Sequence, residues 1–368
     1  MSTASSPGTW TDRTAATHAE RGAAPLRLPP RWLLGGLAAG LVAVTVAALC
    51  IGAYAVTPAE LWTALSAPAS DPAGLQTRAV LADIRLPRVV LALLLGGTLG
   101  ASGAALQAIF RNPLADPGLI GVSSGAALGA ATAIVGLPLL GGAALAHAVG
   151  PALLPLAAFG GALLVTVMVY RLAAERGRVS LPLLLLAGIA INALATALIG
   201  LMLYLATDAQ QRTLTFWSLG SAGGAQWRTL AMVAPPALLG SAWLLRVRGA
   251  LTALQLGDEA AAHLGVPVRR VQKQVLAAAA LAVSALVSCT GVIGFIGLVA
   301  PHGVRLLCGP DQRIVMPGAM LLGALLTVGA DLAARTLAAP ADIPLGVLTA
   351  LFGAPFFMLL LARRRGTL

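Results

Sequence analysis

Few side chains in this chain could do chemistry, and most of them lie outside its apolar stretches. Only 13 of the 368 residues are Asp or Glu, and 4 are His. No HExxH zinc motif is present, and no Gly-x-Ser-x-Gly nucleophile turn is predicted. The single lysine, Lys273, lies between two glutamines, so the chain has no Gly-Lys-Ser or Gly-Lys-Thr phosphate-binding loop. We therefore expect neither catalysis nor a bound cofactor or metal.

One pair of carboxylates is placed where it could bind another protein. Asp258 and Glu259 lie in a segment flanked by glycines, within a loop at about residues 247–269. Acidic residues favour a helix N-terminus, and an apolar stripe beside them would make the helix amphipathic. Such a helix could dock on a soluble partner; a helix lying on the membrane surface is the alternative, although few basic residues support it. The candidate docking residues are Gly257, Asp258, Glu259, Ala260, Leu264 and Gly265.

The elements that hold these residues belong to a membrane protein. Hydrophobic residues make up 58% of the chain and charged residues 10%, and the mean hydropathy is +0.89. A soluble domain carries about 25% charged residues, so this chain lacks the polar surface that water requires. Its 42 glycines favour close packing of helices in lipid. The predicted fold class is an all-α polytopic membrane protein.

Ten apolar stretches are candidates for membrane spans, each of which takes about 20 residues as a helix. They are residues 32–53, 88–110, 118–136, 151–172, 181–206, 228–246, 270–290, 292–308, 314–334 and 345–362. The third and the eighth are short and rich in glycine. We expect one domain of ten transmembrane helices at residues 32–365. The polar segment at residues 1–31 is predicted to be a disordered cytoplasmic tail.

The basic residues predict the orientation. With the N-terminus in the cytoplasm, 18 of the 24 basic residues lie on the cytoplasmic side and 6 outside, in line with the positive-inside rule. Both termini are then cytoplasmic. Because these residues are dispersed between spans, the net charge of +11 does not indicate nucleic-acid binding. Arg85, Arg88 and Arg335 break the rule, and they either meet an acidic partner outside or snorkel to the interface.

Ionisable groups are nearly absent from the spans themselves. Every Asp and Glu lies in a loop or at a helix end, and Asp331 alone is near a span interior. Ion-coupled transporters usually need such groups at mid-membrane, so a secondary transporter is the weaker alternative. The cysteines Cys50, Cys289 and Cys308 show no metal-site spacing and are interpreted as small buried thiols.

Four groups of residues resemble the permease family of siderophore, haem and cobalamin ABC importers. The first group is Arg85-Leu86-Pro87-Arg88, Gly96-Gly97, Leu99-Gly100, Ser102-Gly103, Gln107 and Arg111-Asn112-Pro113-Leu114-Ala115-Asp116-Pro117. The second is Gly257-Asp258-Glu259 with Ala260, Leu264 and Gly265. The third is Gly294-Phe295-Ile296-Gly297-Leu298-Val299-Ala300-Pro301-His302 with Arg305, Gly309, Asp311 and Arg313. The fourth is Asp342-Ile343-Pro344-Leu345-Gly346-Val347 with Thr349, Gly353, Pro355 and Phe356. The chain departs from the family at Gln312, where His is usual, and we expect no change of function.

The resemblance implies a type II ABC importer permease fold and a place in a larger complex. The chain would pair with a second permease subunit, identical or homologous, and with two cytoplasmic ATP-binding subunits. A periplasmic or lipoprotein substrate-binding protein would deliver a metal chelate to this multi-pass protein of the cytoplasmic (inner) membrane. By the same resemblance, residues 257–265 would be the helix that couples to the ATPase. Arg85, Arg88 and Arg335 would meet acidic residues of the binding protein.

The path and the substrate are less well defined. Candidates for lining the path or its gate are Gly103, Gln107, Asn112, Ser123 and Ser124. Asn192, inside the fifth span, either faces the path or hydrogen-bonds to a neighbouring helix. We expect a ferric siderophore, the commonest substrate of this family, with haem and cobalamin as alternatives.

Overall fold

The computed structural model describes residues 28–66, 72–142, 144, 148–175 and 178–365. Nearly all of the predicted N-terminal tail, residues 1–27, therefore lies outside the described residues. The first helix begins at Pro30, one residue before the predicted end of that tail. A proline suits this position because its missing N–H is not needed in the first turn of a helix.

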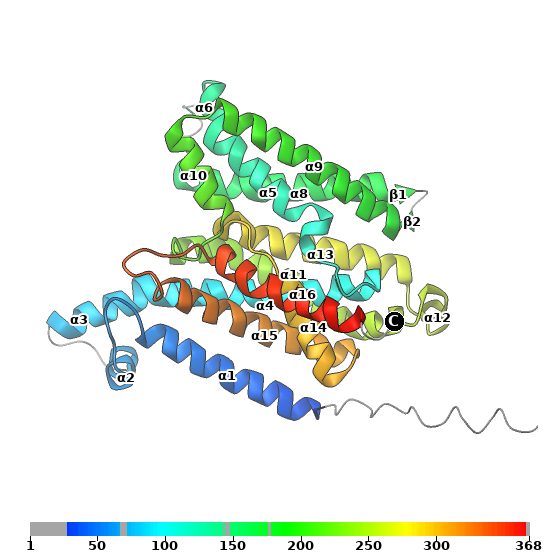
Figure 1. Cartoon of the computed structure of the whole chain (residues 1–368), viewed down its shortest axis with the longest axis horizontal. Coiled ribbons are helices and arrows are strands. Elements are labelled where there is room, and N and C mark those ends of the chain that lie inside the picture. Colours follow the sequence, from blue (N-terminus) through cyan, green and yellow to red (C-terminus); the bar gives the residue numbers. More distant parts are fainter. Residues whose placement is uncertain (1–27, 67–71, 143, 145–147, 176–177, 366–368) are drawn as a thin grey trace, which may run out of the picture.

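Helices make up most of the described chain (Figure 1). In the first half they are α1 (Pro30–Cys50), α2 (Pro58–Ser66), α3 (Pro72–Ala79), η1 (Val80–Arg85), α4 (Leu86–Phe110), η2 (Pro117–Ile120), α5 (Val122–Ala131), η3 (Thr132–Gly136), α6 (Leu137–Leu139), η4 (Gly150–Ala152) and α8 (Leu153–Ala173). Then come α9 (Leu181–Leu205), α10 (Asp208–Ser218), α11 (Trp227–Leu254), α12 (Asp258–His263), α13 (Val268–Thr290), α14 (Ile296–Cys308), α15 (Gln312–Ala334) and α16 (Leu345–Arg365). Two short strands, β1 (Ala174–Glu175) and β2 (Arg178–Val179), pair antiparallel between α8 and α9.

A helix lies at each of the ten predicted spans, in the predicted order. Among the described residues, eight helical stretches are long and apolar enough to cross a membrane. Two shorter apolar helices, α14 and the Leu345–Met358 part of α16, take the places of the predicted eighth and tenth spans. The protein is thus an all-α polytopic bundle with about ten transmembrane helices.

The centre of the bundle is α4, which packs against α15, α11, α14 and α13. Its side chains from Leu95 to Ile109 are all buried. Small residues make this packing close, because a Cβ atom at Gly96 would overlap the backbone carbonyl of Gly323 on α15. Without side chains between them, the two backbones gain van der Waals contact that lipid alone would not provide.

Several boundaries differ from the sequence-based expectation, and three of the differences bear on the fold. α11 continues to Leu254, so the loop predicted at about 247–269 is shorter. Arg246 and Arg248 lower the hydropathy of the sequence, which is why the predicted span ends there. The helix continues past them because Leu244, Leu251 and Leu254 are buried on one helical face. α14 begins at Ile296 instead of residue 292, and the second span extends outward through η1 and α3.

The bundle has two distinct ends (Figure 1). One end holds α12, the beginning of α1 and the end of α16, and we call it the α12 end. The opposite end holds α2, α3 and the end of α1, and we call it the α2 end. The two sets of residues expected to meet partners therefore lie at opposite ends of the protein.

Candidate functional site

At the α12 end, the six-residue helix α12 is bounded by two glycines in conformations that other residues rarely adopt. Gly257 has φ 117° and Gly265 has φ 80°. After the helix, the Gly265 N–H donates to the Ala262 carbonyl at 2.9 Å, and the Val266 N–H donates to the Ala261 carbonyl at 3.0 Å. This pair of bonds is the Schellman motif, which ends helices at a left-handed glycine. The predicted glycine-flanked helix is therefore present.

One side of α12 is seated on the bundle and the other is free. Ala261 is fully buried, whereas Asp258 and Glu259 are exposed and the Leu264 side chain is 65% exposed. Ala260 is half-buried. An exposed leucine beside two carboxylates gives a small apolar contact with a charged border, which is what a protein partner could bind.

Arg111 connects α12 to the loop that follows α4. Its Nη2 forms an ion pair with the Asp258 carboxylate, and its Nε donates to the Leu254 carbonyl at 3.0 Å. Arg111 ends α4 in the left-handed region, with φ 49°, which is uncommon for a residue other than glycine. Sequence reasoning named Arg111 only within a motif and did not foresee this contact, because the two residues are 147 positions apart.

The loop between α4 and α5, which contains Pro113 and Pro117, is held by two of its own side chains. Asn112 Oδ1 accepts from the Leu114 N–H at 2.9 Å, and Asp116 Oδ1 accepts from the Gly118 N–H at 2.8 Å. Burial raises the pKa of the Asp116 carboxyl, and the bond from Gly118 opposes that change. The polar groups freed by two prolines are thus partly satisfied within the loop.

Asn192 on α9 hydrogen-bonds to a neighbouring element, which confirms the second of its two expected roles. Its Oδ1 accepts from Ser124 Oγ at 2.5 Å, and its Nδ2 donates to the Gly118 carbonyl at 3.3 Å. Ser124 therefore helps to join α5 to α9. Ser123 and Asn112 are half-buried.

Ser123 is also the middle residue of a Gly-x-Ser-x-Gly sequence at positions 121–125, which the sequence reasoning overlooked. A nucleophile turn joins a strand to a helix. Here the short helix η2 comes before Gly121 and α5 comes after it, so the motif has no such context. The sequence match therefore gives no support to an enzyme.

Two candidates for the path lie inside the bundle. A Cβ atom at Gly103 would overlap the Gly297 carbonyl on α14. Gln107 is 3% exposed, donates to the Gly297 and Leu298 carbonyls at 3.3 and 3.4 Å, and accepts from Arg305 Nη2 at 2.9 Å. In this single chain both residues face α14 instead of an open surface, and a role in the path stays a prediction.

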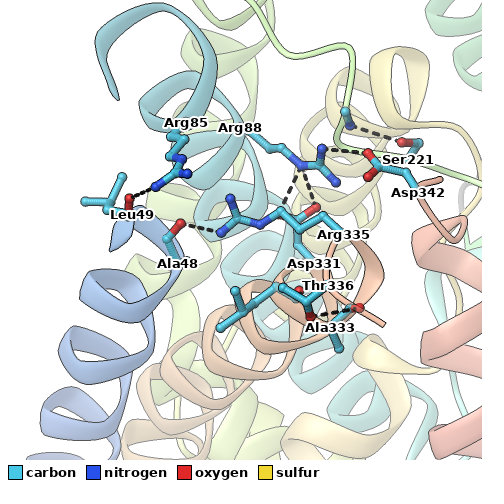
Figure 2. A network of polar contacts seen from close by, with 12 residues as sticks. Ala48, Leu49, Arg85, Arg88, Ser221, Asp331, Ala333, Arg335, Thr336 and Asp342 are labelled. Atoms are coloured by element: carbon cyan, nitrogen blue, oxygen red, sulfur yellow. Dashed lines mark hydrogen bonds and ion pairs between the residues drawn. The ribbon is translucent and has the colours of Figure 1, made fainter. Parts of the chain in front are cut away.

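At the α2 end, two of the three predicted outward arginines bind the last carbonyls of α1 (Figure 2). Arg85 is 4% exposed and donates to the carbonyls of Leu49, Cys50 and Tyr54. Arg335 Nη2 donates to the Ala48 carbonyl. A helix leaves its last four carbonyls without intrahelical partners, and its C-terminus favours positive charge. Both guanidinium groups therefore cap α1, which is otherwise poorly buried.

The third arginine, Arg88, lies between two carboxylates (Figure 2). Its Nε donates to both Asp331 oxygens, at 3.0 and 3.1 Å, and its Nη1 donates to Asp342 Oδ2 at 2.8 Å. The side chains of Arg88 and Asp331 are 12% and 2% exposed, whereas that of Asp342 is 46% exposed. Asp331, the one acid that the sequence places near a span interior, is therefore paired with Arg88.

The segment that carries Asp342 joins this charged cluster to an apolar groove. The Leu345 N–H donates to the Gly220 carbonyl at 2.8 Å, and the Gly346 N–H donates to the Leu219 carbonyl at 3.0 Å. Both bonds fix the start of α16 to the end of α10. The groove, of about 560 Å³, is lined by Ser218, Leu219, Val292, Gly294, Phe295, Gly346, Val347, Ala350, Leu351, Ala354, Pro355 and Met358.

Phe295 is the unusual residue of that groove. It adopts φ 68°, a strained value for a bulky side chain. A Cβ atom at Gly353 would lie 2.6 Å from the Phe295 Cγ, so the ring packs directly on the backbone of α16.

Among the residues that the structure describes, no group of three or more His, Cys, Asp or Glu side chains could hold a metal ion.

Comparisons with known proteins agree with this architecture. Residues 40–363 match the FecCD transport family. The chain is 44% identical to the hemin transport system permease protein HmuU of Yersinia pestis, over 92% of this chain and 98% of that protein. It is 39% identical to the vitamin B12 import system permease protein BtuC of Klebsiella pneumoniae, over 91% of this chain and 95% of that protein.

A solved structure shows the same fold. This structure is of a metal-chelate type ABC transporter in an inward-facing conformation, and its sequence is 33% identical to this chain. The superposition covers 90% of this chain and 99% of that chain, with a TM-score of 0.76. The bundle of about ten spans thus matches a known permease over nearly its full length. The chain belongs to the FecCD transport family and is the multi-pass membrane permease of an ABC importer.

Proposed function

We propose that this permease imports a metal-bound tetrapyrrole across the cytoplasmic membrane, with haem as the first candidate. The observation that carries the substrate class is the 44% identity with a hemin permease over 98% of that protein's length. Cobalamin is the second candidate, because permeases named for it are 41% and 39% identical. These relatives favour a tetrapyrrole over the ferric siderophore expected from the sequence.

The α12 end would face the cytoplasm. The distribution of basic residues supports this orientation. With the α12 end in the cytoplasm, both ends of the described chain lie on the cytoplasmic side (Figure 1). Asp258, Glu259 and Leu264 would then meet an ATP-binding subunit. ATP hydrolysis belongs to that partner, because the only lysine of this chain has no phosphate-binding loop around it.

The cytoplasmic gate would include the loop after α4. Asn112 lies in that loop, and Arg111 binds the loop to Asp258 at the start of α12. A shift of α12 on its ATPase would therefore move the loop directly. The apolar groove beside Phe295 would form one wall of the path, with a second permease subunit as the other wall.

The α2 end would receive the substrate-binding protein. Arg85, Arg88 and Arg335 were predicted to contact it, but in this chain their guanidinium groups are already bound to protein oxygens. Arg85 and Arg335 would thus act by holding the end of α1 in place. Contact with an acidic partner falls to Arg88 and to the exposed residues around it.

The test is transport by the complete complex. The permease, its ATPase and its binding protein are reconstituted in vesicles, and uptake of haem, cobalamin and a ferric siderophore is measured with ATP supplied on the side of the ATPase. We expect ATP-dependent uptake of haem that persists when ionophores collapse the ion gradients. Uptake driven by an ion gradient without ATP would overturn the importer assignment. Uptake of the siderophore alone would overturn the tetrapyrrole assignment.

A further inference from the structure

Arg88 makes two ion pairs of unequal kind. With Asp331 it forms a nearly buried pair, in which Nε reaches both carboxylate oxygens. With Asp342 it forms a single contact at 2.8 Å, and that carboxylate is 46% exposed. Breaking a buried pair leaves an uncompensated charge, whereas an exposed carboxylate can return to water at little cost. Asp342 is therefore the exchangeable partner of Arg88.

The surroundings of Arg88 leave little of its side chain open to solvent. The side chain is 12% exposed, and its Nη1 is bound by the Asp342 carboxylate, which is 46% exposed. The backbone of Gly223 lies beside both groups: a Cβ atom there would be 3.4 Å from Arg88 Nη1 and 3.4 Å from Asp342 Oδ2. A carboxylate from another protein that binds this nitrogen would compete with Asp342 for it.

We propose that Asp342 is a built-in competitor for the acidic partner that docks at this end. A carboxylate of the substrate-binding protein takes the place of Asp342 on Arg88, while Asp331 keeps its own pair. The released segment at residues 341–346 then loosens the start of α16. This inference rests on the proposed function, because it assigns the docking partner to the α2 end.

The same segment explains how the exchange would reach the groove. The Ile343 N–H donates to the Ala334 carbonyl at 3.0 Å, and the next amides bind the carbonyls of Gly220 and Leu219. Gly346 and Leu219 line the groove themselves. Asp342 is thus four residues from Gly346 in the groove wall, and its pair with Arg88 holds that wall against α4.

The proposal predicts a gain of affinity from removing a charged residue. In Asp342→Asn, Arg88 loses its exposed partner but keeps Asp331. The binding protein then no longer has to displace the Asp342 carboxylate, and it should bind about two- to fivefold more tightly. This fold-change corresponds to the free energy that an exposed ion pair contributes. Affinity is measured with the substrate-binding protein of the same transport system on the detergent-solubilised permease.

The matched control is Asp83→Asn. Asp83 lies in η1 at the same end and is exposed, so both variants change the net charge equally near the docking face. Only Asp342→Asn frees Arg88. Asp83→Asn should raise the affinity only through the long-range electrostatic effect of its lost negative charge. Salt at 0.5 M should remove that effect, because the Debye length at this salt concentration falls well below 10 Å.

A second measurement follows the loosened segment. Hydrogen exchange at residues 341–346 should rise in the wild-type protein when the binding protein docks, and should already be high in free Asp342→Asn. Equal or weaker binding by Asp342→Asn than by Asp83→Asn would overturn the competitor role. Absence of any binding to the wild-type protein would instead overturn the proposed function.

Discussion

The guanidinium of Arg111 forms an ion pair with the carboxylate of Asp258, so the end of α4 is bound to the start of α12. Arg111 also donates to the Leu254 carbonyl at the end of α11. One side chain therefore joins the central helix of the bundle, the loop with Asn112 and the helix proposed to meet the ATPase. The predictions begin with this contact.

We expect Arg111→Gln and Asp258→Asn each to lower the amount of substrate carried per ATP hydrolysed, by up to about fivefold. An exposed pair contributes about 0.2–1 kcal/mol, so thermal stability should change little. The double variant Arg111→Gln with Asp258→Asn should lose no more than Asp258→Asn alone, because the ion pair is already absent in that single variant. Losses that add in the double variant would contradict the link.

Leu264 should supply binding energy for the ATPase. Burial of a leucine side chain contributes about 1.5–3 kcal/mol, so Leu264→Ser should weaken association with the ATP-binding subunit by about tenfold or more. Combining it with Asp258→Asn and Glu259→Gln should uncouple ATP hydrolysis from uptake without unfolding the bundle. Leu140→Ser is the control, since Leu140 is 86% exposed and directly follows α6, which lies away from α12 (Figure 1). Normal uptake by the triple variant would refute the docking role.

Arg85 should stabilise the permease by capping α1. Arg85→Ala leaves the carbonyls of Leu49, Cys50 and Tyr54 with fewer donors, and we expect it to lower the free energy of unfolding by about 1–3 kcal/mol. Arg78→Ala, an exposed arginine of the same end, should change it by less than about 0.5 kcal/mol. Thermal unfolding in detergent, followed by tryptophan fluorescence, measures both. If Arg85 instead contacted the binding protein directly, its loss would reduce affinity and leave stability unchanged.

Gly103 should be required for packing. A Cβ atom there would overlap the Gly297 carbonyl, so Gly103→Ala should separate α4 from α14 and destabilise the protein by about 1–3 kcal/mol. Gly200 on α9 has nothing within 4 Å of its Cβ position. Gly200→Ala should therefore be neutral or stabilising by up to about 1 kcal/mol, because alanine favours a helix. Equal stability of the two variants, measured by thermal unfolding, would contradict the close contact.

Several features of the fold follow from local composition and were predicted from the sequence. The spans, their order and the glycine-bounded helix α12 depend on residues close together in the chain, because hydropathy and helix termination act over one or a few turns. The same locality explains the errors. Arg246 and Arg248 stopped the predicted sixth span early, although α11 continues with one face buried to Leu254.

The charged contacts could not be predicted in this way. Arg88 and Asp331 are 243 residues apart, and Arg111 and Asp258 are 147 apart. The sequence by itself determined that these charges lie outside the apolar spans or at their ends, because an unpaired charge in lipid is costly. Only the tertiary structure decided which charge meets which, because that depends on how the helices pack against α4 across the whole bundle.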